Sequence, residues 1–397
     1  MSKIASFVVY ITGLGCLLLS DVLITKLFSS SDIAMWAEIR SLIGISSVLC
    51  LLGLEQVLVR SPNSSGRLLK LLAIQIPIMS ILLGVSIWLC GFLDTWLISV
   101  LIVFCAAASS ALFQYYRSHY KAVLSQISQQ LWKVLALLAL TVAVIYEWPL
   151  DIDVMVFTVM LINVILAASI VFRYRPVGLA QQSPETITSL YSIGFRFLAT
   201  GLLLSLSVYG EQLLVNRLGG QEQGALYFTH ATYFLFPASV LSGYFSFLIG
   251  PWARDNHDKY VGFMRERRHY IFVGTFLYSA LVNFVGWFAW GVVSPVLESP
   301  DIVLQVLFFV ICFFRTIYMW PGAYVGIFGK PKEHDVLVGG HLLALLVAIV
   351  ALCFLIQGKW LEMVYVIAIS SAVNWTLRAA AASSVTRIII KNRSVHE

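Results

Sequence analysis

Long apolar stretches alternate with short polar turns along the whole chain. A helix needs roughly 20 apolar residues to cross a hydrocarbon core of about 30 Å. Stretches of about that length lie near residues 4–28, 33–59, 68–92, 96–116, 130–147, 154–172, 190–214, 225–250, 270–292, 302–325, 335–357 and 362–386. The pattern predicts an all-α, polytopic integral membrane protein with about twelve transmembrane helices.

One polar stretch, RYRPVGLAQQSPETIT at residues 173–188, divides these helices into six and six. We therefore predict an N-terminal six-helix lobe at 1–175, a cytoplasmic linker at 176–188 and a C-terminal six-helix lobe at 189–397. Asp21 and Glu211 each begin an acid-x-Leu-[Ile/Leu] string in the first helix of their half. Two halves that start in the same direction indicate parallel repeats about an axis normal to the membrane.

The formal net charge of +6 is explained by topology. If the N-terminus is inside, most of the 26 lysines and arginines fall in cytoplasmic turns, and the outer turns are acidic. This is the positive-inside pattern, and it predicts that both termini are cytoplasmic. It gives no reason to expect a nucleic-acid partner. The six cysteines show no metal-type spacing.

Five basic residues lie inside predicted spans: Arg40, Lys133, Arg196, Arg315 and Arg378. At about 1.5 Å per residue, Arg40 and Arg196 each lie roughly 12 Å from a helix end. A guanidinium stays charged when desolvated and binds phosphate in a bidentate fork. Arg40, Arg196, Arg315 and Arg378 are therefore candidates for a cationic cavity that binds an anionic substrate. The alternatives are internal ion pairs or, for Arg378 and Lys133 above all, side chains that snorkel to the surface.

Acidic residues are also embedded in the spans. Glu38 and Glu211 are candidates for binding a coupling proton or Na⁺, or for pairing with an arginine. Glu55 lies nearer the inner rim, and Asp21 is expected at the outer rim.

Histidines and aromatic residues add two further expectations. His230 and His341 are lone histidines in helices, and we expect them to be hydrogen-bonded packing residues. The aromatic-rich run from Tyr227 to Phe247 either lines a path for sugar or packs against lipid and neighbouring helices.

Two stretches resemble a known family. The second half begins with YGEQLLVNRLGG, then Gly224 and Tyr227, then an apolar helix that ends at Pro251; LLGLEQVLVR (Leu51 to Arg60) closes the second helix of the first half. These features are similar to Wzx-type flippases, the polysaccharide-transporter branch of the MATE/MOP superfamily. The resemblance implies two six-helix lobes facing a central cavity lined by helices one, two, seven and eight.

The resemblance also implies a function. Such a flippase moves a polyprenyl-pyrophosphate-linked oligosaccharide, an O-antigen or capsule repeat unit, from the inner to the outer leaflet by alternating access. Its location would be the inner membrane of a bacterium. It would act as a monomer among membrane lipids, with polysaccharide assembly proteins as candidate associates.

Three other functions stay open. A cation-coupled multidrug exporter of the same superfamily would favour an acidic cavity, whereas embedded Arg and Lys outnumber embedded Glu here. A membrane glycan polymerase or glycosyltransferase would favour long outer loops, and the outer turns here are short. A generic twelve-span facilitator has the same helix count. No hydrolase, P-loop or zinc motif is present, so we expect a transporter without a cofactor or metal, driven by an H⁺ or Na⁺ gradient, by membrane potential or by substrate pull.

Overall fold

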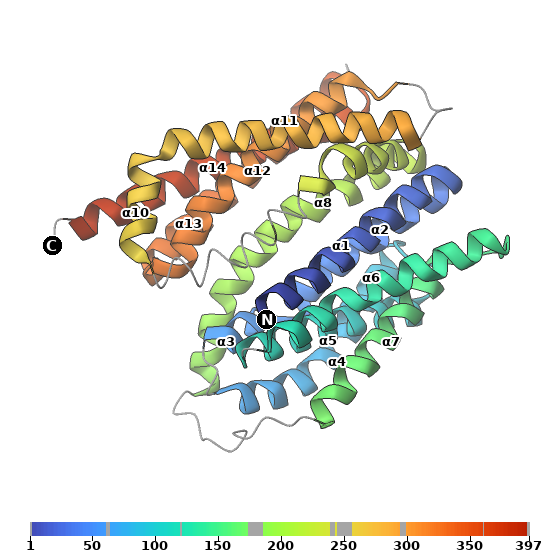
Figure 1. Cartoon of the computed structure of the whole chain (residues 1–397), viewed down its shortest axis with the longest axis horizontal. Coiled ribbons are helices and arrows are strands. Elements are labelled where there is room, and N and C mark those ends of the chain that lie inside the picture. Colours follow the sequence, from blue (N-terminus) through green and yellow to red (C-terminus); the bar gives the residue numbers. More distant parts are fainter. Residues whose placement is uncertain are drawn as a thin grey trace. The chain divides into compact units, whose positions relative to one another are not determined.

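A computed structural model describes residues 2–60, 64–119, 121–173, 186–238, 243, 256–293, 299–359 and 361–394 (Figure 1). These residues form helices and turns and contain no strand. Eleven of the described helices are long and apolar enough to cross a membrane. The predicted all-α, polytopic class is confirmed. The side of the membrane on which each terminus lies stays a prediction.

The chain divides into two compact units, Met1–Gly210 and Glu211–Glu397. The predicted linker at 176–188 lies largely outside the described residues, so the predicted lobe boundaries remain predictions. The boundary between the units falls inside a helix.

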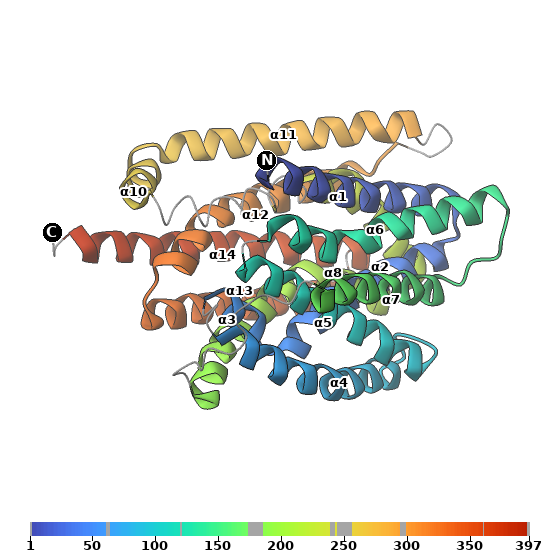
Figure 2. The ribbon, with the colours of Figure 1, turned by 60° about the horizontal axis from the view of Figure 1, so that its bottom comes forward.

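Unit 1 is built around one central helix. Its helices are α1 (Ser2–Leu27), α2 (Ser30–Leu51), α3 (Leu54–Arg60), α4 (Ser65–Leu89), α5 (Trp96–Ser118), α6 (Ala122–Ile145), α7 (Ile152–Arg173) and the first part of α8 (Ile187–Phe234). Helix α5 packs against α2, α3, α4, α6 and α7. Helix α1 instead packs along α6, and the two run side by side in the same direction (Figures 1 and 2).

The predicted second span, 33–59, is interrupted in the structure. Leu52 and Gly53 both have positive φ, at 50° and 76°, so α2 ends and the short α3 begins there. A β-carbon on Gly53 would lie 2.0 Å from the carbonyl oxygen of Gly194 in α8. Glycine is the residue that tolerates both a positive φ and a backbone at that distance. The break therefore lets the start of α8 pack directly against the α2–α3 corner.

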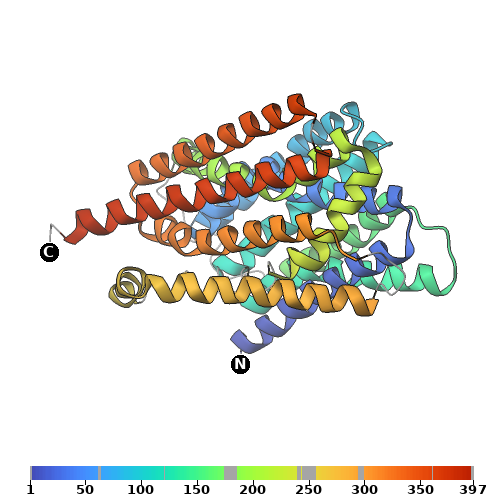
Figure 3. The ribbon, with the colours of Figure 1, turned by 90° about the horizontal axis from the view of Figure 1, so that it is seen from above.

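The described residues of unit 2 form the rest of α8 and five further helices. These are α10 (His257–Glu266), α11 (Arg268–Val293), α12 (Ile302–Phe328), α13 (Pro331–Gly358) and α14 (Met363–Ser394). Helix α14 packs against both α12 and α13, and α11 packs against α12 (Figure 3). Tyr260 of α10 and Tyr324 of α12 are fully buried and stacked, with ring centroids 5.7 Å apart.

Helix α8 explains why eleven spans are found where twelve were predicted. Two spans, 190–214 and 225–250, were expected with a polar turn between them. The 48 residues of α8 are two helices that meet at Gly220, whose backbone angles are not helical (φ 79°, ψ 178°). Tyr227 of the second helix donates a hydrogen bond to Glu211 of the first, so the chain turns back at this glycine, as the sequence predicts. Helix α8 therefore counts as one span although it holds two of the predicted ones, and residues 239–242 and 244–250 of the second lie outside the described residues.

Candidate functional site

Unit 1 contains a buried acid that is fully engaged. Asp21 of α1 is only 1% exposed. Its Oδ1 accepts a hydrogen bond from Trp36 Nε1 at 2.8 Å, and its Oδ2 forms an ion pair with Arg40 Nη1. Trp36 and Arg40 are four residues apart on α2, so they lie on one helix face. Asp21 was expected at the outer rim; its depth in the membrane stays a prediction, and the structure shows that Trp36 and Arg40 of α2 cover it.

A second cation joins this cluster from α6. Lys133 is 9% exposed, and its Nζ donates to Gln130 Oε1 at 2.6 Å. Its charge also interacts with Asp21 and Arg40. The prediction that Lys133 snorkels is therefore wrong, because α6 packs along α1 and supplies an amide partner one turn away. Cluster 1, consisting of Asp21, Trp36, Arg40, Lys133 and Gln130, holds two cations and one carboxylate.

Unit 2 contains a comparable acid on α8. Glu211 Oε2 accepts a hydrogen bond from the Tyr227 hydroxyl at 2.6 Å. Its Oε1 accepts another from Ser371 Oγ of α14 at 2.5 Å. The charge of Arg315 on α12 interacts with this carboxylate as well. The candidate residue Glu211 thus lies where α8, α12 and α14 of unit 2 meet.

Two candidate arginines share one aromatic ring beside this acid. The Cζ atoms of Arg315 and Arg378 lie 5.5 and 5.8 Å from the centroid of the Trp375 ring. Such distances allow cation–π attraction. Arg378 is 0% exposed, and its Nε donates to Asn374 Oδ1 at 3.1 Å. Arg378 does not snorkel, because α14 is 32 residues long and continues well past it. Cluster 2 comprises Glu211, Tyr227, Arg315, Ser371, Asn374, Trp375 and Arg378.

The two clusters follow one plan. In each unit the acid accepts a hydrogen bond from an aromatic side chain 15 or 16 residues later, Trp36 for Asp21 and Tyr227 for Glu211. In each unit two basic residues accompany that acid. Sequence reasoning found both acids as the starts of similar strings but missed both aromatic donors. The recurring spacing from acid to aromatic residue was the available signal.

Other candidate residues lie apart from these contacts. Arg196 is exposed on α8, and Glu38 is partly exposed on α2. Each has interactions of its own, and neither contributes to the cluster contacts described above. Glu55 of α3 is 7% exposed, and its Oε2 has no hydrogen-bond partner among the described residues.

The two histidines differ from each other. His230 has the hydrogen-bonded role expected of it: Nδ1 lies 2.9 Å from the Leu226 carbonyl oxygen, and Nε2 accepts from the Asp301 amide at 3.0 Å. His341 is fully buried, and neither ring nitrogen has a hydrogen-bond partner within the described part of the chain. Its ring instead packs 5.4 Å from that of Tyr318. The expectation for His341 was wrong, because the neighbour it meets is aromatic.

Asp301 caps the start of α12. Its Oδ1 accepts from the amides of Val303 and Leu304 at 2.8 and 2.9 Å, and its Oδ2 accepts from the Tyr365 hydroxyl at 2.5 Å. Burial alone would raise the pKa of this carboxyl. The hydrogen bonds from Tyr365 and from the two amides outweigh burial and hold the pKa below its ordinary 3.8. The ionised cap ties α12 to α14.

The described part of the aromatic run from Tyr227 to Phe247 is packing. Tyr227, Phe228 and Phe234 are buried, and Tyr227 lies edge-on to Phe308 with centroids 5.1 Å apart. These side chains do not line an open path. Of the remainder, residues 239–242 and 244–247 lie outside the described residues. Within the described residues no group of three or more His, Cys, Asp or Glu side chains could hold a metal ion.

Comparison with known proteins identifies the fold. No protein-family profile and no curated protein matches the chain. Several solved structures do match the chain. A eukaryotic MATE transporter, AtDTX14, matches with a TM-score of 0.56 and 14% identity, over 98% of this chain and 97% of that one. A mutant of the Vibrio cholerae MATE transporter VcmN matches with a TM-score of 0.59 and 14% identity, over 98% and 95%.

A third match is a MOP superfamily transporter from Pyrococcus furiosus, with a TM-score of 0.53 and 14% identity, over 98% and 95% of the two chains. Sequence identity this low shows the fold alone. The chain therefore has a MATE-like, all-helical membrane fold over its whole length.

Proposed function

We propose that this protein is a transporter that carries an anionic, lipid-linked substrate, a polyprenyl-pyrophosphate oligosaccharide, from the inner to the outer leaflet by alternating access. The observation that supports it most is the charge balance of the clusters. Arg40 and Lys133 accompany Asp21, and Arg315 and Arg378 accompany Glu211. Each cluster thus brings two basic side chains and one carboxylate together inside the membrane-spanning helices.

Ionisable residues inside the membrane are costly and usually mark a substrate or ion pathway. A pyrophosphate is an anion that paired basic side chains bind. Arginine suits it, because its planar donors match phosphate oxygens and it keeps its charge when desolvated. In cluster 2, Arg315 and Arg378 both lie over the Trp375 ring, which holds two basic side chains at one place in unit 2. A bacterial inner membrane is the location that fits such a substrate.

A second candidate function is a cation-coupled multidrug exporter. The buried carboxylates Asp21 and Glu211 favour it, because an embedded acid can take up a proton or Na⁺. One structure of this fold is an outward-facing multidrug resistance MATE transporter of the MOP superfamily, with a TM-score of 0.54 and 15% identity. Another, the Pyrococcus furiosus transporter, is described as having a pocket of reverse polarity that suggests a different function. Paired cations beside both acids favour an anionic substrate here.

The test is transport by purified protein in vesicles loaded with a labelled polyprenyl-pyrophosphate oligosaccharide. We expect Arg40→Ala and Arg315→Ala to lose at least about tenfold in rate, equivalent to about 1.4 kcal/mol. Arg40→Lys should recover only part of the transport rate, because an ammonium cannot bind phosphate through two parallel N–H groups as a guanidinium does. Arg217→Ala, which removes an exposed arginine of α8, is the matched control. Wild-type rates in both cluster variants at equal abundance would exclude the cationic clusters as substrate sites.

Deleting the gene in its host separates the two candidates. Accumulation of complete lipid-linked oligosaccharide, seen by mass spectrometry of extracted lipids, supports the flippase. Unchanged lipids with greater sensitivity to cationic drugs would favour the exporter. Arg196→Ala tests the remaining arginine from the sequence prediction, which expects loss of transport there too.

A further inference from the structure

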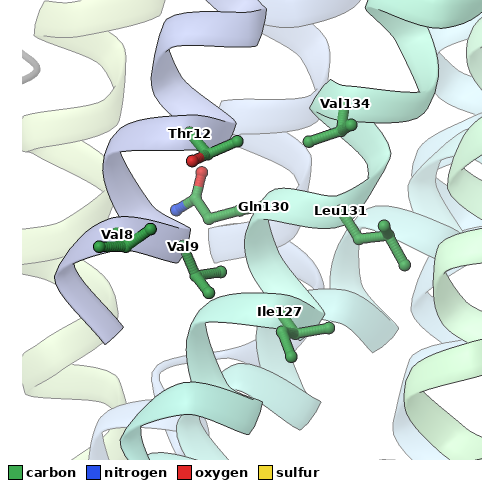
Figure 4. Close-up of a pocket in the computed structure, with 7 residues that line it drawn as sticks. All are labelled: Val8, Val9, Thr12, Ile127, Gln130, Leu131 and Val134. Carbon is green, nitrogen blue, oxygen red and sulfur yellow. The ribbon is translucent and has the colours of Figure 1, made fainter. Parts of the chain in front are cut away.

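A groove of about 160 Å³ lies between α1 and α6 of unit 1 (Figure 4). Its walls are mainly aliphatic and come from both helices: Val8, Val9, Ile127, Leu131 and Val134. Val8 is 55% exposed, so the groove is open along one side. The proposed function does not use it.

The groove has one polar end, formed by Thr12 and Gln130 (Figure 4). Gln130 is 2% exposed and lies against Gly13 of α1, where an added β-carbon would be 2.4 Å from Gln130 Cβ. The missing side chain of Gly13 is thus what allows the amide to lie between the helices. Gln130 Oε1 accepts from Lys133 Nζ, and Gln130 Nε2 donates to Gln126 Oε1 at 3.3 Å.

This amide joins the groove to cluster 1. The Lys133 ammonium that it holds interacts electrostatically with Arg40 and Asp21. An aliphatic slot therefore ends beside two cations and one carboxylate. A ligand that matches both parts is an amphiphile with a hydrocarbon chain and an anionic head.

We propose that the groove holds the first isoprene units of a polyprenyl phosphate, with the phosphate drawn toward Lys133 and Arg40. This rests on the proposed function and names the place where the carrier lipid binds. The size agrees, because an apolar cavity of about 150 Å³ accommodates a benzene molecule. The groove therefore takes one or two branched five-carbon units, and the rest of the chain stays in lipid.

The position of the groove along α6 indicates how the bound lipid would be oriented. Ile127 is five residues and Lys133 eleven residues past the start of α6, so they lie about 8 and 17 Å along its axis. On the predicted topology α6 starts at the cytoplasmic face. The phosphate would then lie near mid-membrane, and the chain would point back toward the cytoplasm. That is the orientation of a lipid of the outer leaflet, so the groove would stabilise a carrier that has already turned over.

The test uses the full chain in vesicles and a sugar-free polyprenyl phosphate with a photoactivatable diazirine in its first isoprene units. After irradiation, labelled peptides are identified by mass spectrometry. We expect labels on α1 and α6, and competition by unlabelled polyprenyl phosphate but not by phosphatidylglycerol. Val134→Trp should fill the groove and reduce labelling at least about tenfold, or about 1.4 kcal/mol of binding free energy.

Ile78→Trp is the matched control, because Ile78 is 53% exposed on α4 of the same unit and an indole there leaves the groove open. Gly13→Ala provides a second test if Val134→Trp fails to fold. Its β-carbon displaces Gln130, so labelling should fall without any bulky group in the groove.

Labels elsewhere on the chain, equal competition by phosphatidylglycerol, or undiminished labelling of Val134→Trp and Gly13→Ala would each overturn the proposal. Transport of the complete lipid-linked oligosaccharide is measured in the same vesicles. Transport without groove labelling removes the groove and leaves the proposed function. Groove labelling without transport removes the proposed function and leaves a lipid-phosphate site.

Discussion

Cluster 1 makes an ordered prediction about the stability of unit 1. Asp21→Asn removes the carboxylate that Arg40 and Lys133 share. Arg40→Met leaves Asp21 with the Trp36 hydrogen bond and the charge of Lys133. The aspartate variant should therefore be the less stable of the two, although each removes one partner of the same ion pair.

The magnitudes follow from burial. Asp21 is 1% exposed and Arg40 18% exposed. Removing one partner of a buried pair costs about 3 to 5 kcal/mol, and Asp21→Asn should fall in that range. Arg40→Met should cost about 1 to 3 kcal/mol, because Asp21 keeps a hydrogen bond and a cation. The double variant should cost less than the sum, with a coupling energy of about 2 kcal/mol.

The assay is the free energy of unfolding in mixed micelles, followed by far-UV circular dichroism. Asp94→Asn, which removes an exposed carboxylate in the turn before α5, is the control and should stay within about 0.5 kcal/mol of wild type. An Arg40→Met cost equal to or above that of Asp21→Asn, or strict additivity in the double variant, would refute the idea that Lys133 shares the acid.

Three further predictions concern other parts of the structure. Gly53→Ala should reduce thermal stability, because a left-handed conformation costs about 1 to 2 kcal/mol for a residue with a β-carbon and that carbon would meet α8; a thermal melt measures it. The pKa of Asp301 is lowered in the folded protein, so its stabilising effect is present above pH 3.8 and is lost as pH falls through the folded-state pKa. Tyr365→Phe removes one hydrogen bond that lowers this pKa, so the loss of stability should begin at higher pH in a titration of unfolding free energy against pH. An unchanged dependence of stability on pH would contradict this. Trp375→Leu should lower substrate affinity about tenfold by releasing both arginines, while Trp375→Phe retains part of it in a binding titration.

Much of the fold was accessible from the sequence because lipid imposes a length on each helix. Runs of apolar residues predicted the class and nearly all spans. The misses lie where backbone geometry, not hydropathy, decides the outcome. Gly53 breaks one predicted span in two, whereas Gly220 lies in the polar turn where the sequence predicts a break. A single glycine in an apolar run, such as Gly53, does not by itself indicate that the helix will end there.

The contacts within the two clusters were harder to predict from the sequence. The sequence placed Arg315, Arg378 and Glu211 inside spans, but their meeting at Trp375 depends on how α8, α12 and α14 are rotated about their axes. Lys133 was expected to snorkel because depth was counted along one helix. Its real environment is set by α1, a helix distant in sequence. To predict which side chains meet across two helices, one must know how the helices are rotated and shifted against each other. A single sequence does not reveal this.

The recurrence of an acid and a downstream aromatic donor also has a meaning for ancestry. A gene duplication of a six-helix precursor would leave this trace, and such a precursor would have worked as a pair of identical subunits. The two donors differ in their chemistry. The indole of Trp36 can only donate a proton, whereas the phenol of Tyr227 can both donate and accept one. The acid of unit 2 can therefore exchange a proton with its aromatic partner, whereas the acid of unit 1 can only accept a hydrogen bond from it.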